Sequence, residues 1–283
     1  MNLTGPSVPG LLFGMPMNNP KIPDQFNAIS GLGALHDYFP VRNWNRRGSL
    51  VISLLFLAGT VLVLLFGIYQ AVLAARLHGP SMIDDKLAVP VGIALVLFVF
   101  GLLAGWNAFA NWNKGAAVYD RGFAYRDRKG LQAWRWEEVA SLTSAITRHY
   151  TNGIYSGTSH RYTLFNHQNA LLVLSDSIGK VELLAQAIDE NTFPLLYGPT
   201  AGLYNTGQTL VFGPVAISKT GITIGKKTYP WLDVNEVSIR RGVLKVSRKG
   251  GGWLSGARAE AAVIPNLRVL LAIINQVVGV KAV

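Results

Sequence analysis

The sequence predicts an α+β membrane protein, with a two-helix transmembrane hairpin followed by two similar β-rich units that each end in a helix. Three observations predict this class. Two long apolar stretches lie in the first half of the chain. Short alternating apolar and polar runs, separated by turn residues, fill the rest, as is typical of β-strands. One pattern of strands and turns occurs twice in that second part.

Composition supports a membrane location. Of the 283 residues, 50% are hydrophobic and only 14% are charged, whereas soluble domains carry about 25% charged residues. The formal net charge is +11. Such an excess of Lys and Arg lies mostly on the cytoplasmic side of membrane proteins, and it can also serve acidic lipid or nucleic acid. The absence of cysteine excludes disulfides, thiolate nucleophiles and cysteine metal sites.

The N-terminal part of the chain divides into five predicted segments. We expect residues 1–28 to be a mostly disordered tail and residues 29–47 to be a juxtamembrane segment. Transmembrane helices are expected over 48–75 and 89–112, because each stretch is uncharged and provides the ~20 apolar residues that cross a bilayer. Residues 76–88 form the extracytoplasmic loop between them.

Flanking charges predict the orientation of the hairpin. Cations precede the first span and follow the second, whereas the connecting loop has no net charge. The positive-inside rule therefore places both termini in the cytoplasm. Indole rings prefer the membrane interface, and three tryptophans lie near the span ends: Trp44, Trp106 and Trp112.

Glycines in the spans favour close helix packing. Gly101 and Gly105 have GxxxG spacing, and Gly59 and Gly67 lie in the other span. Small residues let helix backbones approach, so these glycines indicate packing within the hairpin or a homo-oligomer. The alternative is that glycine is simply common in membrane helices. The spans carry no ionisable residue, which favours an anchor over an ion path.

The pattern that occurs twice defines the two β-rich units. It reads VYDRGFAYRDRKGLQAWRWEEVASL over 118–142 and AISKTGITIGKKTYPWLDVNEVSI over 216–239. Each copy has a strand, a turn ending in Gly122 or Gly221, further strands, and then Trp, an acidic residue and Val. We therefore expect β-sandwich or barrel units over the ranges 113–190 and 208–283, joined by a linker over 191–207.

An amphipathic helix is expected to close each unit, over about 178–190 and about 265–278. The second helix repeats apolar residues at helical spacing, which predicts that it covers the open end of the β-structure. A helix lying on the membrane is the alternative. Strands followed by one C-terminal helix are typical of the pleckstrin-homology (PH) fold.

Two motifs carry a resemblance to a known family. They are TRHYTNGIYSGTSHRYTL over 147–164 and FGPVAISKTGITIGKKTYPWLDV over 212–234. The chain resembles an uncharacterised bacterial membrane-protein family with a transmembrane hairpin and PH-like cytoplasmic domains. The resemblance covers about 30–40 and 114–283. It implies the PH-like fold and a location in the bacterial inner membrane, and it supplies no activity.

The first motif contains the residues that most resemble catalytic chemistry. Asn152-Gly153 predicts a β-hairpin with its loop over 151–158. Side chains alternate along a strand, so we expect His149 and His160 on opposite faces of the sheet. No acidic residue lies between Glu138 and Asp176 to orient either histidine. A structural hairpin is therefore favoured over an active site.

Basic residues are the remaining functional signal. Anionic lipid attracts each Lys or Arg near the membrane surface with about 1 kcal/mol. The alternative is a solvated face that only sets topology. Nucleic acid is not expected, because no aromatic platform accompanies the charge. The candidate residues for binding lipid or a partner protein are Arg46, Arg47, Lys114, Arg121, Arg126, Arg128, Lys129, Arg240, Arg241, Lys245, Arg248 and Lys249.

These observations predict a non-catalytic, membrane-anchored scaffold or binding module for a partner protein or anionic lipid headgroups. A small hydrolase using His149 or His160 is one alternative, and an accessory subunit of a transporter or channel is another. We expect no cofactor and no metal, because the other histidines are isolated in sequence and the segment 221–228 departs from the phosphate-binding loop pattern.

Overall fold

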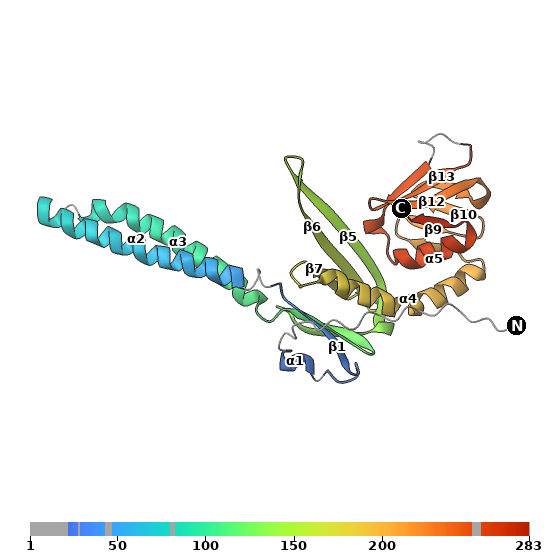
Figure 1. Cartoon of the computed structure of the whole chain (residues 1–283), viewed down its shortest axis with the longest axis horizontal. Helices are drawn as coiled ribbons and strands as arrows, with labels where there is room; N and C mark the ends of the chain where they lie inside the picture. The colour runs from blue at the N-terminus through green and yellow to red at the C-terminus, as the bar shows by residue number, and fades with distance from the viewer. Residues whose placement is uncertain (1–21, 28, 43–46, 80–82, 251–255, 283) are drawn as a thin grey trace.

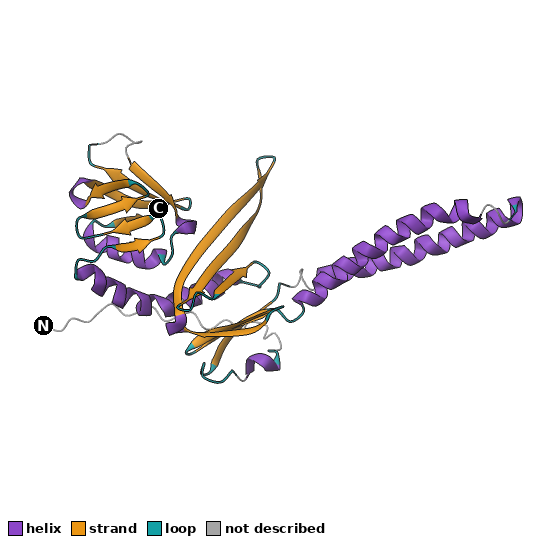
Figure 2. Ribbon diagram, turned by 180° about the vertical axis from the view of Figure 1, so that it is seen from behind, coloured by secondary structure: helices purple, strands orange, loops and turns teal. Residues whose placement is uncertain are grey.

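The computed structural model describes residues 22–27, 29–42, 47–79, 83–250 and 256–282. Figure 1 shows a helical hairpin that extends away from the rest of the chain, a first β-rich unit at its base, and a second β-rich unit on the far side of the first. Figure 2 shows from behind that the hairpin is purely helical and that both units combine strands with helices. The α+β class is as predicted from the sequence.

Helices α2 (Ser49–His78) and α3 (Ile83–Asn111) form the hairpin. Both are long and apolar enough to cross a membrane. Only 17% and 11% of their most apolar windows are buried inside the protein, so they are not core helices of a soluble domain. The two spans are therefore helical as predicted, and the connection between them is shorter than the expected 76–88.

The predicted glycines pack inside this hairpin. A Cβ atom on Gly67 would lie 2.5 Å from the Cβ of Pro90. The Ser53 hydroxyl donates a 2.8 Å hydrogen bond to the carbonyl of Gly101. The other two predicted glycines also contact the opposite helix: Gly59 and Gly105. In this structure all four glycines thus lie on the faces of α2 and α3 that meet inside the hairpin.

The first unit contains two sheets with a core between them. One sheet has the strand order β1-β2-β3-β4 and the other has the order β5-β6-β7. The bounds are β1 (Leu35–Pro40), β2 (Gly115–Tyr119), β3 (Gly122–Asp127), β4 (Gly130–Arg135), β5 (Val139–Thr151), β6 (Ile154–Asn166) and β7 (Leu171–Ser175). No sheet among these described strands closes into a barrel.

Strand β1 corrects the expected juxtamembrane segment over 29–47. It pairs antiparallel with β2, from Asp37 opposite Val118 to Pro40 opposite Gly115. The apolar helical hairpin is therefore inserted between two neighbouring strands of one sheet. This insertion ties α2 and α3 to the first unit through two adjacent chain connections.

Residues 22–27 correct part of the predicted disordered tail. Helix α1 (Asp24–Asn27) places a fully buried Phe26 against the outer face of β2 and β3. The Tyr119 hydroxyl donates a 2.7 Å hydrogen bond to the carbonyl of Phe26, and burial raises the pKa of Tyr119 to about 12. The rest of the predicted tail lies outside the described residues.

Helix α4 (Val181–Asn205) corrects the predicted linker over 191–207. Its first half packs in the core of the first unit and its second half packs against the core of the second. Figure 1 shows α4 changing direction along its length, which is consistent with Pro194 and Pro199 inside it. One bent helix thus belongs to both units.

The second unit has the same order of elements as the first. Its sheets are β8-β9-β10-β11 and β14-β13-β12-β15. The bounds are β8 (Leu210–Phe212), β9 (Val215–Ile217), β10 (Gly221–Ile224), β11 (Lys227–Pro230), β12 (Val234–Arg240), β13 (Val243–Arg248), β14 (Gly256–Glu260), α5 (Leu267–Val277) and β15 (Val280–Ala282). The apolar face of α5 is buried in the core of this unit, as predicted.

The internal repeat extends to individual hydrogen bonds. The indole N–H of Trp136 donates to the carbonyl of Asp120 at 3.1 Å, and that of Trp231 donates to Ser218 at 2.8 Å. Each tryptophan thereby fixes the turn that leads into the glycine of its repeat. Added Cβ atoms at Gly122 and Gly221 would lie 2.2 and 2.3 Å from a carbonyl oxygen of the neighbouring strand. This explains why Gly and Trp recur at equivalent places.

The two units are also joined outside α4. Asn266, just before α5, accepts a 2.9 Å hydrogen bond from the N–H of Leu142 and donates a 3.0 Å bond to the carbonyl of Ala140, both on β5. Arg268 forms a 2.9 Å ion pair with Asp189 of α4. The described parts of the two units therefore contact each other directly.

Candidate functional site

The β5–β6 hairpin differs from its prediction in length. Asn152 and Gly153 have φ angles of 51° and 80° and form a two-residue turn, as Asn-Gly predicts. The expected loop over 151–158 is wrong, because β6 already begins at Ile154. Gly157 lies within β6 at a register shift rather than in a second turn. The hairpin therefore extends as a two-stranded arm well beyond β7 (Figure 1).

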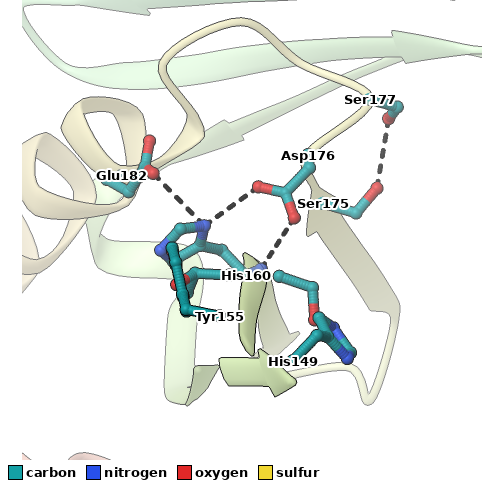
Figure 3. Close-up of polar contacts among 9 residues, drawn as sticks. His149, Tyr155, His160, Ser175, Asp176, Ser177 and Glu182 are labelled. Carbon is teal, nitrogen blue, oxygen red and sulfur yellow. Dashed lines mark hydrogen bonds and ion pairs between the residues drawn. The ribbon is translucent and has the colours of Figure 1, made fainter. Parts of the chain in front are cut away.

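The register of this hairpin places the two histidines on opposite faces. His160 lies opposite Ile146, whereas His149 lies opposite Gly157. Directly paired residues share a face of an antiparallel sheet and successive residues alternate, so the predicted separation of the two histidines is confirmed. Figure 3 shows the His149 ring pointing away from the group around His160.

Strand β7 brings a carboxylate to His160. Arg161 pairs with Ser175, the last residue of β7, so Asp176 comes beside His160. One Asp176 oxygen accepts the backbone N–H of His160 at 2.8 Å. The other lies 3.0 Å from His160 Nδ1. The backbone bond orients the carboxylate toward the ring.

The first turn of α4 brings a second carboxylate to the same nitrogen. Lys180 adopts a left-handed conformation with φ 57° directly before the helix. Glu182 then places Oε1 3.2 Å from His160 Nδ1 (Figure 3). Three different elements thus converge on one point: β6, the end of β7 and the start of α4.

A surface pocket of about 350 Å³ opens beside these side chains. The chain leaving β1 toward α2 borders it, because Val41 bridges to Ile178 and the Arg42 N–H donates to the Ser177 carbonyl at 2.8 Å. The pocket therefore lies beside the base of the helical hairpin. Its lining residues are Arg42, Tyr155, Thr158, His160, Asp176, Ile178, Gly179, Lys180 and Glu182.

Neither histidine of the motif completes a nucleophilic triad among the described residues. His149 Nε2 lies 2.8 Å from the Ser159 hydroxyl but has no carboxylate partner. His160 has two carboxylates but no hydroxyl hydrogen-bonded to its ring. Because the two rings occupy opposite faces, they cannot combine these parts on one substrate.

A third histidine, His36, is paired although it is isolated in sequence. Its Nε2 lies beside an Asp120 carboxylate oxygen, and the other Asp120 oxygen accepts the Ala34 N–H at 2.7 Å. The backbone bond from Ala34, followed by the bond with His36, lowers the pKa of Asp120. This exposed pair ties the segment before β1 to the β2–β3 turn.

Comparison with known proteins identifies the family. Residues 17–281 match a family of unknown function, DUF6585. The chain belongs to the DUF6585 family. A search of curated proteins finds no match. The match spans the hairpin, both β-units and the pocket of this DUF6585 protein.

The structure distributes the predicted basic residues over several separate surfaces. Arg126, Arg128 and Lys129 lie at the end of β3 and in the β3–β4 turn, beside the start of β2. The Arg128 guanidinium lies 5.8 Å from the ring centre of Trp106 on α3. Lys114 lies between α3 and β2, and burial lowers its pKa, an effect that Asp127 opposes.

Other predicted basic residues lie away from this group. Arg121 lies in the β2–β3 turn, at the end of the strands opposite to Arg126 and Arg128. Arg47 is exposed at the start of α2, and Arg46 lies outside the described residues. The remaining candidates are on the second unit, far from the hairpin (Figure 1): Arg240, Arg241, Lys245, Arg248 and Lys249. Of these, Arg248 forms a 3.2 Å ion pair with Asp233.

Sequence reasoning missed the carboxylates around His160. They come from positions 16 and 22 residues later in the chain. One signal could have found the first of them. If the turn after β6 is centred near residue 168, antiparallel pairing places position 176 opposite His160. The position of Glu182 depends on how α4 packs, and no local sequence pattern predicts this packing.

Proposed function

We propose that this protein is a non-catalytic binding module anchored in the bacterial inner membrane, with both termini and both β-units in the cytoplasm. In support, each unit has a run of four antiparallel strands, a tryptophan-containing 3-10 turn, a run of three strands and then a helix. This order resembles the PH-like fold. A shared fold does not dictate a ligand, so the ligand is argued from the basic residues.

One observation carries the lipid proposal: the β3–β4 turn lies at the end of the first unit from which the apolar hairpin leaves, and we call this end the membrane end. The hairpin leaves the sheet at Pro40 and returns at Gly115, and these residues pair with each other. The end of β3 pairs with that same point, so Arg128 and Lys129 follow it directly in the turn. The guanidinium stacked near Trp106 matches the interface where indole rings prefer to lie.

We therefore propose anionic lipid headgroups as the ligand of Lys114, Arg126, Arg128 and Lys129. Each cation near an anionic surface contributes about 1 kcal/mol. Neutralising two of them should weaken lipid binding by about 2 kcal/mol, or roughly 30-fold. The cations of the second unit should contribute little, because that unit lies on the far side of the first and surface charge is screened within about 10 Å.

Native mass spectrometry of the full chain, released from detergent with phosphatidylglycerol, tests this proposal. The double variant Arg128→Gln, Lys129→Gln should retain fewer lipids than the wild type. The matched control Arg240→Gln, Arg241→Gln makes the same charge change in the second unit and should retain as many as the wild type. Equal retention by all three proteins would show that the membrane-end cations only set topology.

A second candidate function is self-association, which would use the β5–β6 arm instead of the glycines of α2 and α3. Among the described strands only β6 pairs with β5, so the outer edge of β5 is open along the arm. Ile146, Tyr150, Ile154 and Tyr155 are exposed there, with Ile154 74% accessible. Open edges pair readily with another strand, and a two-stranded ribbon is only marginally stable alone. Two copies could pair along this edge around a twofold axis.

Light scattering of the full chain in detergent measures this assembly. We expect a dimeric wild type, a monomeric Ile146→Ser, Ile154→Ser variant, and a dimeric control Leu232→Ser, which changes an equally exposed apolar residue of the second unit. A monomeric wild type would contradict the second candidate and leave the lipid proposal unaffected.

A further inference from the structure

We propose that His160, Asp176 and Glu182 bind a divalent transition-metal ion. The three side chains come from β6, the residue after β7 and the first turn of α4, and their ligand atoms all lie within 4.8 Å of one another. Figure 3 shows both carboxylates directed at the same imidazole nitrogen. The inference goes beyond lipid binding, because it concerns a different surface and a different ligand.

The first argument is that a single imidazole nitrogen faces two carboxylate oxygens, and one hydrogen cannot satisfy both. His160 Nδ1 carries at most one hydrogen, yet carboxylate oxygens lie 3.0 and 3.2 Å from it. A hydrogen on Nδ1 can make only one well-aligned bond, and an Nδ1 lone pair would face two negative oxygens. A cation at this point accepts the lone pairs of all three atoms at once.

The second argument is geometric. Ligand atoms about 2.0–2.1 Å from a metal and separated by about 90–110° lie about 2.9–3.4 Å from each other. Both nitrogen-to-oxygen distances fall in that range. The third separation, between the two carboxylates, is within 4.8 Å, so a movement of the half-exposed Glu182 side chain would complete the geometry.

The surroundings also resemble those of metal ligands. Outer hydrogen bonds commonly orient a ligating carboxylate, and the second oxygen of Asp176 accepts the His160 backbone N–H at 2.8 Å. The His160 side chain is largely buried, at 15% exposure, whereas Glu182 is 52% exposed. The site is thus fixed on its sheet side and accessible from its helix side.

The donor set selects the class of ion. One imidazole nitrogen with two carboxylate oxygens suits a borderline metal such as Zn²⁺, whereas Mg²⁺ and Ca²⁺ prefer oxygen ligands alone. Two carboxylates and a neutral imidazole balance a divalent charge. Three protein ligands leave coordination positions open, and these would face the pocket that Arg42, Tyr155 and Thr158 also line. The ion would link the first turn of α4 to β6 and to the end of β7.

Isothermal titration of Zn²⁺ into the full chain tests the proposal, in detergent, after chelator treatment and without an affinity tag. We expect one ion per chain in the wild type. Glu182→Gln should weaken binding at least tenfold and His160→Gln should abolish it. His149→Ala is the matched control, because it removes a histidine on the opposite face of the same hairpin, and it should bind like the wild type.

Melting curves of the metal-free proteins check folding. Glu182→Gln changes a half-exposed side chain, so its metal-free melting temperature should equal that of the wild type. Saturating Zn²⁺ should raise the melting temperature of the wild type but not of His160→Gln. The proposal is overturned if the wild type binds no Zn²⁺, or if Glu182→Gln binds it as tightly as the wild type does. The cluster would then be a hydrogen-bonded group that fixes α4 to the sheet without a metal.

Discussion

Replacing Asn266 by alanine should destabilise the protein and make the two β-units unfold at different temperatures. Asn266 lies just before α5 and adopts a left-handed conformation with φ 50°. Its side-chain amide pairs with backbone groups of Ala140 and Leu142 on β5, which is an edge strand whose one described strand partner is β6. A third bond, from the Asn266 N–H to the Leu142 carbonyl at 2.9 Å, does not depend on the side chain.

The expected magnitude has two parts. Each of the two side-chain hydrogen bonds contributes about 0.5–1.5 kcal/mol. Alanine in the left-handed region adds roughly 1–2 kcal/mol that glycine does not. Asn266→Ala should therefore lower the free energy of unfolding by about 2–5 kcal/mol, and Asn266→Gly should lower it by about 1–3 kcal/mol.

Differential scanning calorimetry of the full chain in detergent measures this effect. About 2–4 °C of melting temperature corresponds to each kcal/mol in a chain of this size, so the alanine variant should melt roughly 4–20 °C lower. It should also show two transitions where the wild type shows one, because α4 would then be the main remaining connection. A single transition at the wild-type temperature would refute the role assigned to Asn266.

Three further outcomes are expected. Gly221→Ala should destabilise the second unit by more than 1 kcal/mol in chemical unfolding, because the new Cβ meets a carbonyl of β11 at 2.3 Å; a neutral effect would contradict this close approach. Gly67→Ala should lower the melting temperature in detergent, because its Cβ meets Pro90, whereas Gly92→Ala has open space and should not; equal melting would count against the packing. The lowered pKa of Asp120 contributes stability above about pH 3.8, and this contribution is lost as pH falls through the lower folded pKa. Melting temperatures between pH 6 and 2.5 should therefore fall less in Asp120→Asn than in the wild type, and parallel curves would contradict the assignment.

The repeated unit could be predicted because its signals are local. The glycine, the basic turn and the tryptophan lie within one short stretch in each copy. The indole bonds of Trp136 and Trp231 show why these residues must stand at that spacing. Local hydrophobicity likewise located α2, α3 and the apolar face of α5.

Elements that depend on distant partners could not be predicted. Strand β1 is short, and its partner β2 follows only after the whole transmembrane hairpin. Helix α4 was expected to end before Pro194, yet it continues because apolar residues on both sides of the prolines pack into two different cores. Tertiary packing overrides the local preference of proline in this helix.

Only part of the candidate site could be predicted from the sequence. The alternation of strands separated His149 from His160, and the Asn-Gly turn fixed the arm. The carboxylates of Asp176 and Glu182 were missed, because one depends on the β6–β7 register and the other on the direction in which α4 leaves Lys180. The basic residues were found, but only strand pairing separates Arg121 from the membrane-end group.

The depth of the β3–β4 turn at the membrane tests the central claim most directly. The chain has no cysteine, so a spin label on Lys129→Cys or on Arg241→Cys reports one position. In nanodiscs containing phosphatidylglycerol, the label at position 129 should lie at headgroup depth, with low accessibility to a water-soluble relaxation agent. The label at position 241 should remain fully accessible to that agent. Equal, full accessibility at both positions would contradict a basic turn held at the membrane surface.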